Sequence, residues 1–257
     1  MRDKLPDFSQ RITGMILLLP LIAMFLAGKP YSQITVFLCG VIMVFEYCFL
    51  ITKNIVLRFA LIGTICCFGL NSLFLFEPIY QLIYIVILGV VLIQFFSVQI
   101  SAMGLILAFL LFSVGKLYHY QSFQEVMAYI IVTVISVDVG AYIVGRFAGG
   151  PKLMPLVSPA KTISGAIGGL VGGLVAGISA CYFLKLQITQ ELVFLTMTVA
   201  ILAQAGDITE SFFKRSVNAK DSAKIIPGHG GFMDRFDGYL FVVPLFALSP
   251  AYRLFIQ

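Results

Sequence analysis

The run "GAIGGLVGGLVAG", residues Gly165–Gly177, has no charged or polar side chain and lies inside an apolar stretch over residues 163–184. A helix needs roughly 20 apolar residues to cross a bilayer, whereas a transmembrane strand needs about 10 with alternating polarity. A helix also satisfies its own backbone hydrogen bonds, which lipid cannot do. The stretch therefore predicts a membrane-spanning helix, and its small residues predict close packing against neighbouring helices.

Composition extends this interpretation to the whole chain. Of its 257 residues, 60% are hydrophobic and only 11% are charged, and the mean hydropathy is +1.02. A soluble domain carries about 25% charged residues, and a chain this apolar could not cover its own core. An ordinary soluble domain is excluded, and we expect an all-α, polytopic integral membrane helical bundle.

Nine apolar segments have a length suited to membrane-spanning helices. They lie at about residues 12–28, 34–52, 57–76, 79–99, 101–117, 125–147, 163–184, 191–213 and 236–254. We interpret the first as a retained span, because no small-x-small cleavage site follows it. Neither a repeat nor a low-complexity linker divides the segments, so we expect one membrane-embedded domain over residues 1–257.

The basic residues predict the orientation of the bundle. With the N-terminus in the cytoplasm, 13 of the 17 lysines and arginines lie in inner segments, and four lie in outer ones: Lys29, Lys116, Lys185 and Arg253. The positive-inside rule favours this arrangement. The polar loops at about 148–162 and 214–235 then both face the cytoplasm.

Several charges lie within the apolar segments, where a carboxylate is costly and indicates function by default. Asp138 occurs late in one span, in "SVDVGAYIVGR", where pairing with Arg146 is the structural alternative. In "AQAGDITESFFKR", Asp207, Glu210 and Lys214 recur at helical spacing and share a face. A Glu210–Lys214 salt bridge is the alternative there, but it leaves Asp207 unexplained.

The stretch "KDSAKIIPGHGGFMDRFDG", Lys220–Gly238, concentrates charge and glycine in an otherwise apolar chain. Asp234 and Asp237 are three residues apart at the start of a predicted helix, so they share a face. Glycines let backbone N–H groups approach an anion, and the start of a helix is electropositive. This loop suits phosphate, and His229 is either a general base or a phosphate ligand.

Together these segments predict a site for phosphate chemistry. Four aspartates, at the cytoplasmic ends of three spans, supply oxygen ligands of the kind that Mg²⁺ prefers: Asp138, Asp207, Asp234 and Asp237. Six cations accompany them: Lys161, Lys214, Arg215, Lys220, Lys224 and Arg235. Metal ions and basic side chains stabilise an in-line displacement at phosphorus, so we expect phosphoryl or nucleotidyl transfer.

The stretch "SFFKRSVNAKDSAKIIPGHGGFMDRFDG", Ser211–Gly238, closely resembles the signature of the phosphatidate cytidylyltransferases, the CDP-diacylglycerol synthases. The serine, Lys-Arg, Lys-Asp, proline, His-Gly-Gly, Asp-Arg and final aspartate stand at the family spacing. "QAGDITES" and "DVGAY…GR" also resemble family motifs, as do "QRITGMILL" and "FEY" (Phe45–Tyr47) more weakly. The resemblance spans nearly the whole chain, and its specificity lies in a catalytic signature over residues 204–238.

The resemblance implies that CTP and phosphatidic acid give CDP-diacylglycerol and pyrophosphate, with Mg²⁺ and, as an open alternative, a second monovalent cation such as K⁺. It implies metal ligands at Asp207, Asp234 and Asp237, with Lys214 and Arg215 as further catalytic residues. It implies substrate contacts from Lys161, Ser211, Lys220, Asp221, Lys224, His229, Gly230, Gly231, Arg235 and Asp138. The partners are then CTP, phosphatidic acid and the lipid bilayer, without nucleic acid.

One segment departs from the family pattern. "SPAKTISGAIGG", Ser158–Gly169, resembles a stretch that usually has a lysine and a glutamate where this chain has Ala160 and Ser164. Lys161, Thr162 and Gly165 match the pattern. The departure leaves reduced activity or altered substrate use open, and it does not affect the aspartates.

Three alternatives stay open at this level. An ion-coupled transporter also uses intramembrane carboxylates, but it predicts internal repeats that the sequence lacks. A related CTP-dependent enzyme acting on another lipid phosphate or a lipid alcohol would share the signature, and an inactive paralogue would explain Ala160 and Ser164. We expect a site facing the cytoplasm at a bacterial inner membrane. The glycine run favours packing within the chain and also permits a homodimer.

Overall fold

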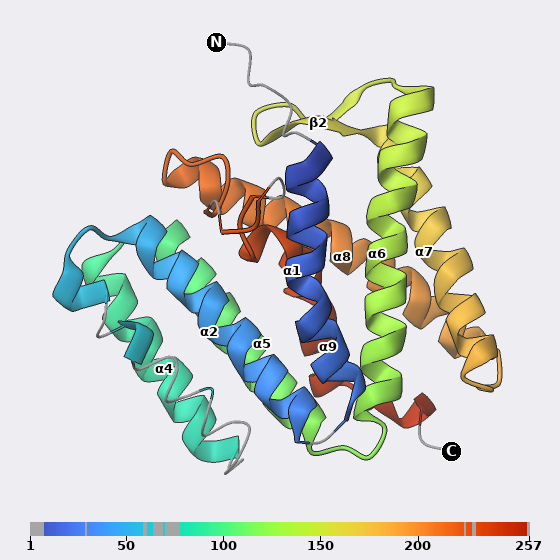
Figure 1. The fold of residues 1–257 in the computed structure, drawn as a ribbon, viewed down its shortest axis with the longest axis horizontal. Helices are drawn as coiled ribbons and strands as arrows, with labels where there is room; N and C mark the ends of the chain where they lie inside the picture. The colour runs from blue at the N-terminus through green and yellow to red at the C-terminus, as the bar shows by residue number, and fades with distance from the viewer. Residues whose placement is uncertain are drawn as a thin grey trace.

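The computed structural model of the protein describes residues 8–28, 30–58, 61–63, 69, 78–223, 225–227 and 230–255. Its long helices are α1 (Phe8–Leu26), α2 (Tyr31–Ile51), α4 (Pro78–Phe95), α5 (Val98–Tyr118), α6 (Phe123–Ala148), α7 (Ile163–Phe183) and α8 (Gln190–Ser216). Helices α6 and α7 pack along their lengths, and α2, α4 and α5 form a second group (Figure 1). The expected helical membrane fold is confirmed.

Five helices of the described part of the chain are long and apolar enough to cross a membrane. They are residues Ile34–Ile51 of α2, together with α5, α6, α7 and α8. Their outward side chains, such as Ile135 and Val139 on α6 and Val171 and Val175 on α7, are apolar and exposed, as lipid contact requires. The expected count of nine spans is not confirmed, and the predicted span 57–76 lies mostly outside the described residues.

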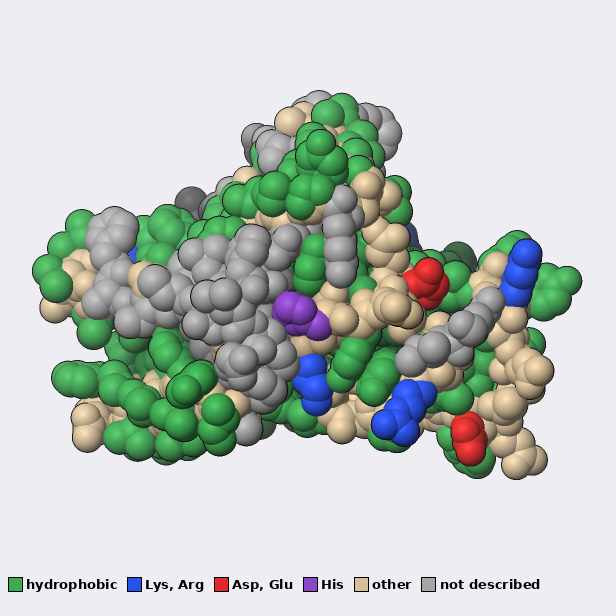
Figure 2. All heavy atoms as spheres, turned by 90° about the horizontal axis from the view of Figure 1, so that it is seen from below, with side chains coloured by type: hydrophobic (Ala, Val, Ile, Leu, Met, Phe, Trp, Pro, Cys, Tyr) green, Lys and Arg blue, Asp and Glu red, His purple; other side chains and the backbone are tan. Residues whose placement is uncertain are grey.

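One end of the bundle carries little charge. Figure 2 looks onto the molecule from below the view of Figure 1, where only a few lysine, arginine and acidic side chains are scattered among apolar ones. The β1–β2 hairpin lies at the opposite end, at the top of Figure 1. The hairpin carries Lys161, one of the cations of the predicted site.

The expectation of one continuous helix over residues 236–254 is wrong. The segment consists of η2 (Asp237–Tyr239), α9 (Val242–Leu248) and η3 (Pro250–Phe255). Ser249 ends α9 in an extended conformation, because a proline disfavours the helical conformation in the residue before it. Helix α9 is buried among the other helices, with Val242 and Phe246 fully enclosed. The apolar stretch is long enough to span a membrane, but its helix α9 is instead buried in the core of the bundle.

The predicted polar loop at 148–162 forms a small antiparallel hairpin. Strands β1 (Lys152–Met154) and β2 (Ser158–Thr162) pair Lys152 with Thr162 and Met154 with Ser158. Thr162 then begins α7, since its hydroxyl accepts a hydrogen bond from the backbone N–H of Gly165 at 3.1 Å. This cap fixes where the strand ends and the helix starts. The hairpin is therefore joined rigidly to α7.

The glycine run of α7 packs against helices of the same chain, as expected. A Cβ added to Gly140 of α6 would stand 2.5 Å from the carbonyl oxygen of Gly168 and 3.3 Å from the Cα of Gly172. On the other side, a Cβ added to Gly173 would lie 3.1 Å from the Cβ of Ala200 in α8. Only backbone fits in the first contact, so side-chain-free positions set the spacing of α6, α7 and α8.

We expect the substitution Gly140→Ala to destabilise the bundle. The added methyl group would overlap the α7 backbone, which cannot move aside as a side chain can, and overpacking costs about 1–3 kcal/mol. The measurement is the thermal unfolding midpoint of the purified protein in detergent, which should fall. The matched control is Gly63→Ala, since no described residue lies within 4 Å of a Cβ at position 63. Equal midpoints for the two variants would contradict the close contact.

Candidate active site

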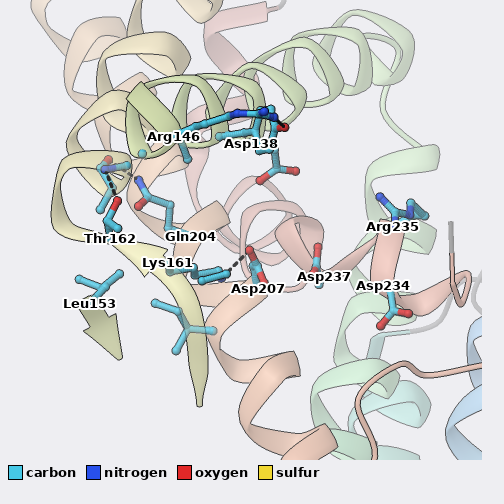
Figure 3. A pocket seen from close by; sticks show the side chains of 17 residues that line it. Asp138, Arg146, Leu153, Lys161, Thr162, Gln204, Asp207, Asp234, Arg235 and Asp237 are labelled. Atoms are coloured by element: carbon cyan, nitrogen blue, oxygen red, sulfur yellow. Dashed lines mark hydrogen bonds and ion pairs between the residues drawn. The ribbon is translucent and has the colours of Figure 1, made fainter. Parts of the chain in front are cut away.

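A cavity of about 530 Å³ lies between the hairpin, the C-terminal half of α6, the start of α7, the middle of α8 and the segment that follows residue 233 (Figure 3). Its charged lining consists of Asp138, Arg146, Lys161, Asp207, Asp234, Arg235 and Asp237. Four separate parts of the sequence supply these side chains. The structure thus brings the four aspartates singled out in the sequence to the wall of one cavity.

Two of these aspartates are neighbours because α8 has a glycine at the crossing point. A Cβ on Gly206 would stand 2.2 Å from the carbonyl oxygen of Asp237, so η2 can lie directly against α8 only with glycine there. Asp237 itself supplies the carbonyl oxygen of this contact. Its carboxylate lies within electrostatic reach of Asp207 and Asp138. Figure 3 shows the carboxylates of Asp207 and Asp237 side by side at the cavity.

The hairpin delivers a cation to Asp207. Lys161 Nζ lies 2.5 Å from Asp207 Oδ2, and both side chains are partly exposed to the cavity. Ser211, one turn along α8, donates a longer hydrogen bond to Asp207 Oδ1 at 3.5 Å. Asp207 is therefore held between the hairpin and its own helix while remaining at the cavity surface.

A second set of charges is buried beside the cavity. Lys214 Nζ lies 2.5 Å from Glu210 Oε2 and 2.6 Å from Asp234 Oδ1. Glu210 is fully buried, and Lys214 is 9% exposed. The structural alternative of a Glu210–Lys214 salt bridge is confirmed, and the same lysine also binds the η1 segment (Met233–Arg235). Asp207 does not take part in this salt bridge and pairs with Lys161 instead.

Asp234 lines the cavity and also organises the loop before it. Besides Lys214, its carboxylate accepts hydrogen bonds from the backbone N–H of Gly231 at 2.9 Å and of Ser222 at 3.2 Å. Burial by itself would raise the pKa of Asp234, but the hydrogen bond and charge of Lys214 outweigh burial and hold that pKa below its ordinary value. Asp234 is therefore an ionised group with several partners already in place.

Glu46 is a buried acid to which the sequence motifs assign no role. It lies in the apolar helix α2, is 1% exposed, and accepts hydrogen bonds from Ser222 Oγ, Phe232 N and Met233 N at 2.7–2.8 Å. Its signal was the one applied to the other acids: a lone carboxylate inside an apolar span indicates function. The motif "FEY" contains it, but the sequence reasoning gave it no role.

The remaining candidate residues occupy different positions around this loop. Arg215 donates to the carbonyl oxygens of Val157 at 3.3 Å and Ala219 at 3.1 Å, so the two polar loops meet. The carbonyl oxygen of Gly230 accepts from the backbone N–H of Ile226 at 3.0 Å, and Lys220 and Asp221 are exposed. Lys220 and Asp221 are absent from the cavity lining. Lys224 and His229 lie outside the described residues.

The departures from the family pattern also lie beside the cavity. Ala160 lines it next to Lys161 and adds no charge. Ser164 donates a hydrogen bond to the carbonyl oxygen of Gly149, which links α7 to the end of α6. Arg146 lines the cavity from α6 and donates to the hydroxyl of Tyr142 at 2.6 Å, rather than pairing with Asp138. The cavity thus receives a basic group from α6 that the sequence reasoning had assigned only as a possible partner of Asp138.

The donor chemistry of the cavity fits a hard cation such as Mg²⁺. Its four carboxylates, Asp138, Asp207, Asp234 and Asp237, come from α6, α8, η1 and η2 and offer oxygen ligands alone. Within the described part of the chain, however, no three acidic, histidine or cysteine side chains stand together closely enough to form a ready metal site. Asp207 is occupied by Lys161 and Asp234 by Lys214.

Comparison with known proteins gives a consistent result. A model of the cytidylyltransferase family matches residues 9–252 of the chain. Proteins named phosphatidate cytidylyltransferase from Staphylococcus haemolyticus and Staphylococcus epidermidis are 40% identical over 136 residues, and one from Staphylococcus aureus is 36% identical. Each match covers 51% of this chain and 52% of the relative, so it spans about half the length of these curated relatives.

We expect Lys214→Met to lower the stability of the protein strongly. The variant would leave Glu210 and Asp234 without their shared cation, and removing one partner of a buried ion pair costs about 3–5 kcal/mol. Adding Glu210→Gln should restore part of the loss, because one of the uncompensated charges is then gone. Unfolding in detergent by heat or denaturant measures both effects. Lys152→Met, at an exposed position of β1, is the control, and equal losses in the two lysine variants would refute the network.

Proposed function

The chain belongs to the cytidylyltransferase family, and we propose that it transfers the cytidylyl group of CTP to phosphatidic acid, forming CDP-diacylglycerol and pyrophosphate. The observation that supports this activity is the cavity, whose acidic and basic side chains come from the apolar, membrane-length helices α6 and α8 and from the polar segments packed against them. Such a position allows a soluble nucleotide and a lipid head group to meet. The names of the matched staphylococcal proteins support the same substrates.

The proposed reaction is a displacement at phosphorus. A phosphate oxygen of phosphatidic acid attacks the α-phosphorus of CTP, and the bond between the α-phosphorus and the oxygen bridging to the β-phosphorus breaks. Pyrophosphate leaves with that bridging oxygen and the electron pair of the broken bond. The reaction needs no nucleophile from the protein, so the chain contributes by holding both substrates in line and by neutralising charge.

The basic side chains of the cavity are suited to that task. Lys161, Arg146 and Arg235 line it from three different elements, the hairpin, α6 and η1. Preorganised cations stabilise charge that develops during the transfer. We assign the phosphate groups of both substrates to these three residues, with Lys220 and Lys224 as further contacts to the triphosphate on the resemblance of their motif.

We propose that Asp207 and Asp237 hold Mg²⁺ in this cavity. They lie beside each other, and Asp138 faces them across the same space. When bound, Mg²⁺ neutralises charge on the phosphate oxygens and draws them into position. Asp234, a metal ligand by resemblance, has its carboxylate engaged by Lys214 and two backbone N–H groups, so we give it the organisation of the loop as its first role.

The location follows from the chemistry of the substrates. The apolar helices make the chain a membrane protein. We propose that the cavity faces the cytoplasm of a bacterial inner membrane, where CTP is available and phosphatidic acid is a membrane lipid. The excess of lysine and arginine in the segments on this side supports that orientation.

The test is an assay with the purified full chain in detergent, labelled CTP, phosphatidic acid and Mg²⁺. We expect equal amounts of CDP-diacylglycerol and pyrophosphate. Parallel reactions replace phosphatidic acid by another lipid phosphate or by a lipid alcohol. Turnover of CTP with one of those lipids alone would reject phosphatidic acid as the acceptor, and no turnover with any lipid would reject the activity.

We expect Asp207→Asn and Asp237→Asn to lower kcat by about 100-fold or more, since removal of one electrostatic element of an active site typically costs about that much. Both changes keep the size of the side chain and remove its charge. Glu191→Gln, an exposed change in the first turn of the same helix α8, is the matched control and should leave kcat unchanged. Wild-type kcat in Asp237→Asn would refute the assignment of this carboxylate.

A further inference from the structure

The carboxylate of Glu46 is buried, and its hydrogen-bond donors in the described part of the chain all belong to one loop. It lies in the apolar helix α2, which contains a membrane-length stretch over Ile34–Ile51, and only 1% of the residue is exposed. Burying a charged group without hydrogen bonds is very costly. Glu46 therefore depends on its three donors, which all belong to residues 222–233.

These hydrogen bonds join the two ends of the loop. Ser222 stands at its start and donates through Oγ to Glu46 Oε2 at 2.8 Å. Phe232 and Met233 stand at its end and donate through their backbone N–H groups, each at 2.7 Å. Hydrogen bonds to an ionised acceptor are stronger than neutral ones. One side chain of α2 thus closes a loop that is 176 or more residues away in the sequence.

Asp234 closes the same loop from the opposite side. It accepts from the backbone N–H groups of Ser222 and Gly231 and is itself bound by Lys214 of α8. Ser222 therefore donates to both acids, through its hydroxyl to Glu46 and through its backbone to Asp234. The loop is clamped between two carboxylates, one supported by α2 and the other by α8.

We call the hydrogen bonds that Glu46 and Asp234 accept from Ser222, Gly231, Phe232 and Met233 the clamp. The clamp leaves no room for a side chain at position 231. A Cβ added to Gly231 would stand 1.7 Å from Ser222 Oγ, 2.7 Å from the backbone nitrogen of Ala223 and 3.0 Å from Glu46 Oε2. The start and end of the loop are in direct contact there. Glycine is therefore required at position 231, because the start and the end of the loop approach each other closely there.

The clamp determines where the cavity residues lie. Met233 is the first residue of η1, and Asp234, Arg235 and Asp237 follow it directly and line the cavity. Glu46 itself is not among the cavity-lining residues. A movement of Phe232 and Met233 would carry these three side chains with it, because η1 and η2 are short and only Phe236 separates them.

We propose that Glu46 is a positioning residue for the active site: from outside the cavity it fixes the loop 222–233, and so the placement of Asp234, Arg235 and Asp237. This deepens the proposed function and rests on it for the consequence in catalysis. The hydrogen bonds of Glu46 to Ser222, Phe232 and Met233 do not depend on the proposed function. The two parts can therefore be tested by separate measurements.

The first measurement is hydrogen exchange of the substrate-free full chain in detergent, followed by mass spectrometry of the peptide over residues 222–236. Glu46→Gln keeps the shape of the side chain but replaces one acceptor oxygen by a donor group. We expect exchange in this peptide to accelerate by about tenfold or more, because hydrogen bonds to a charged group are lost. Exchange in residues 165–177 of α7 should not change.

The matched control is Tyr47→Phe, the neighbour of Glu46 in the same helix. It removes the buried hydrogen bond from Tyr47 Oη to the carbonyl oxygen of Ile100 at 2.8 Å, which ties α2 to α5 and does not touch the loop. This variant should leave exchange in 222–236 unchanged. Acceleration of that peptide by Tyr47→Phe to the same extent would show that any damage to α2 loosens the loop, and it would overturn the specific role of Glu46.

Ser222→Ala provides a second variant in case Glu46→Gln exchanges rapidly everywhere. It removes one of the three donors and leaves Glu46 in place, so we expect a smaller acceleration confined to the same peptide. No local change in either variant would overturn the proposal. Glu46→Asp keeps the charge on a shorter side chain and should restore protection in part.

The second measurement separates positioning from a general loss of structure. With CTP and phosphatidic acid as substrates, we expect Glu46→Gln to raise KM for CTP and lower kcat by about tenfold each, the size of effect that follows from misplacing catalytic groups. Glu46→Asp should recover part of both. Unchanged kinetics despite faster exchange would overturn the positioning role. Faster exchange in Glu46→Gln, together with no turnover of CTP by the wild-type chain, would instead reject the proposed function and leave the clamp intact.

Discussion

The structure depends on one constraint: an acid that is buried in an apolar bundle must be met there by a cation or by hydrogen-bond donors. Glu46 satisfies it with three donors from the segment 222–233, and Glu210 satisfies it with Lys214. Lys214 in turn binds Asp234. Each compensation thus reaches the same polar part of the chain, at Ser222 and at residues 232–234, so the groups that compensate the buried acids also fix these residues.

A second, apolar constraint positions the other half of the cavity. Helices α6, α7 and α8 approach so closely that backbone meets backbone at Gly140 and Gly168. Asp138 and Arg146 of α6 and Asp207 of α8 line the cavity next to this contact. The hairpin joins the start of α7, and its second strand carries Lys161. Dispersion and backbone contact can define these distances in lipid, where no hydrophobic effect draws helices together. The cavity forms where this rigid group meets the clamped segment.

The candidate site illustrates how far spacing within one helix can lead. Asp207, Glu210 and Lys214 do share one side of α8 as their spacing predicted, yet they serve two different places. Asp207 meets the hairpin at the cavity, while Glu210 and Lys214 are buried beside η1. The difference arises from partners in other elements, which no periodicity within α8 could indicate. The carboxylate of Glu46 in an apolar span was a visible signal, but its partners among the described residues stand more than 170 positions away, so the sequence could not show what it binds.

The sequence by itself determined that the chain is helical and embedded in a membrane, because apolar length and the lack of charge depend on composition alone. It also singled out the four aspartates that line the cavity, because a carboxylate in or beside an apolar segment is costly wherever the helix lies. The tertiary structure decided that residues 236–254 break into three short pieces, with α9 buried inside the bundle, and that residues 152–162 pair as a hairpin. It also decided which acid meets which cation. These outcomes depend on the contacts that each segment finds in the folded bundle, and hydropathy carries no information about those contacts.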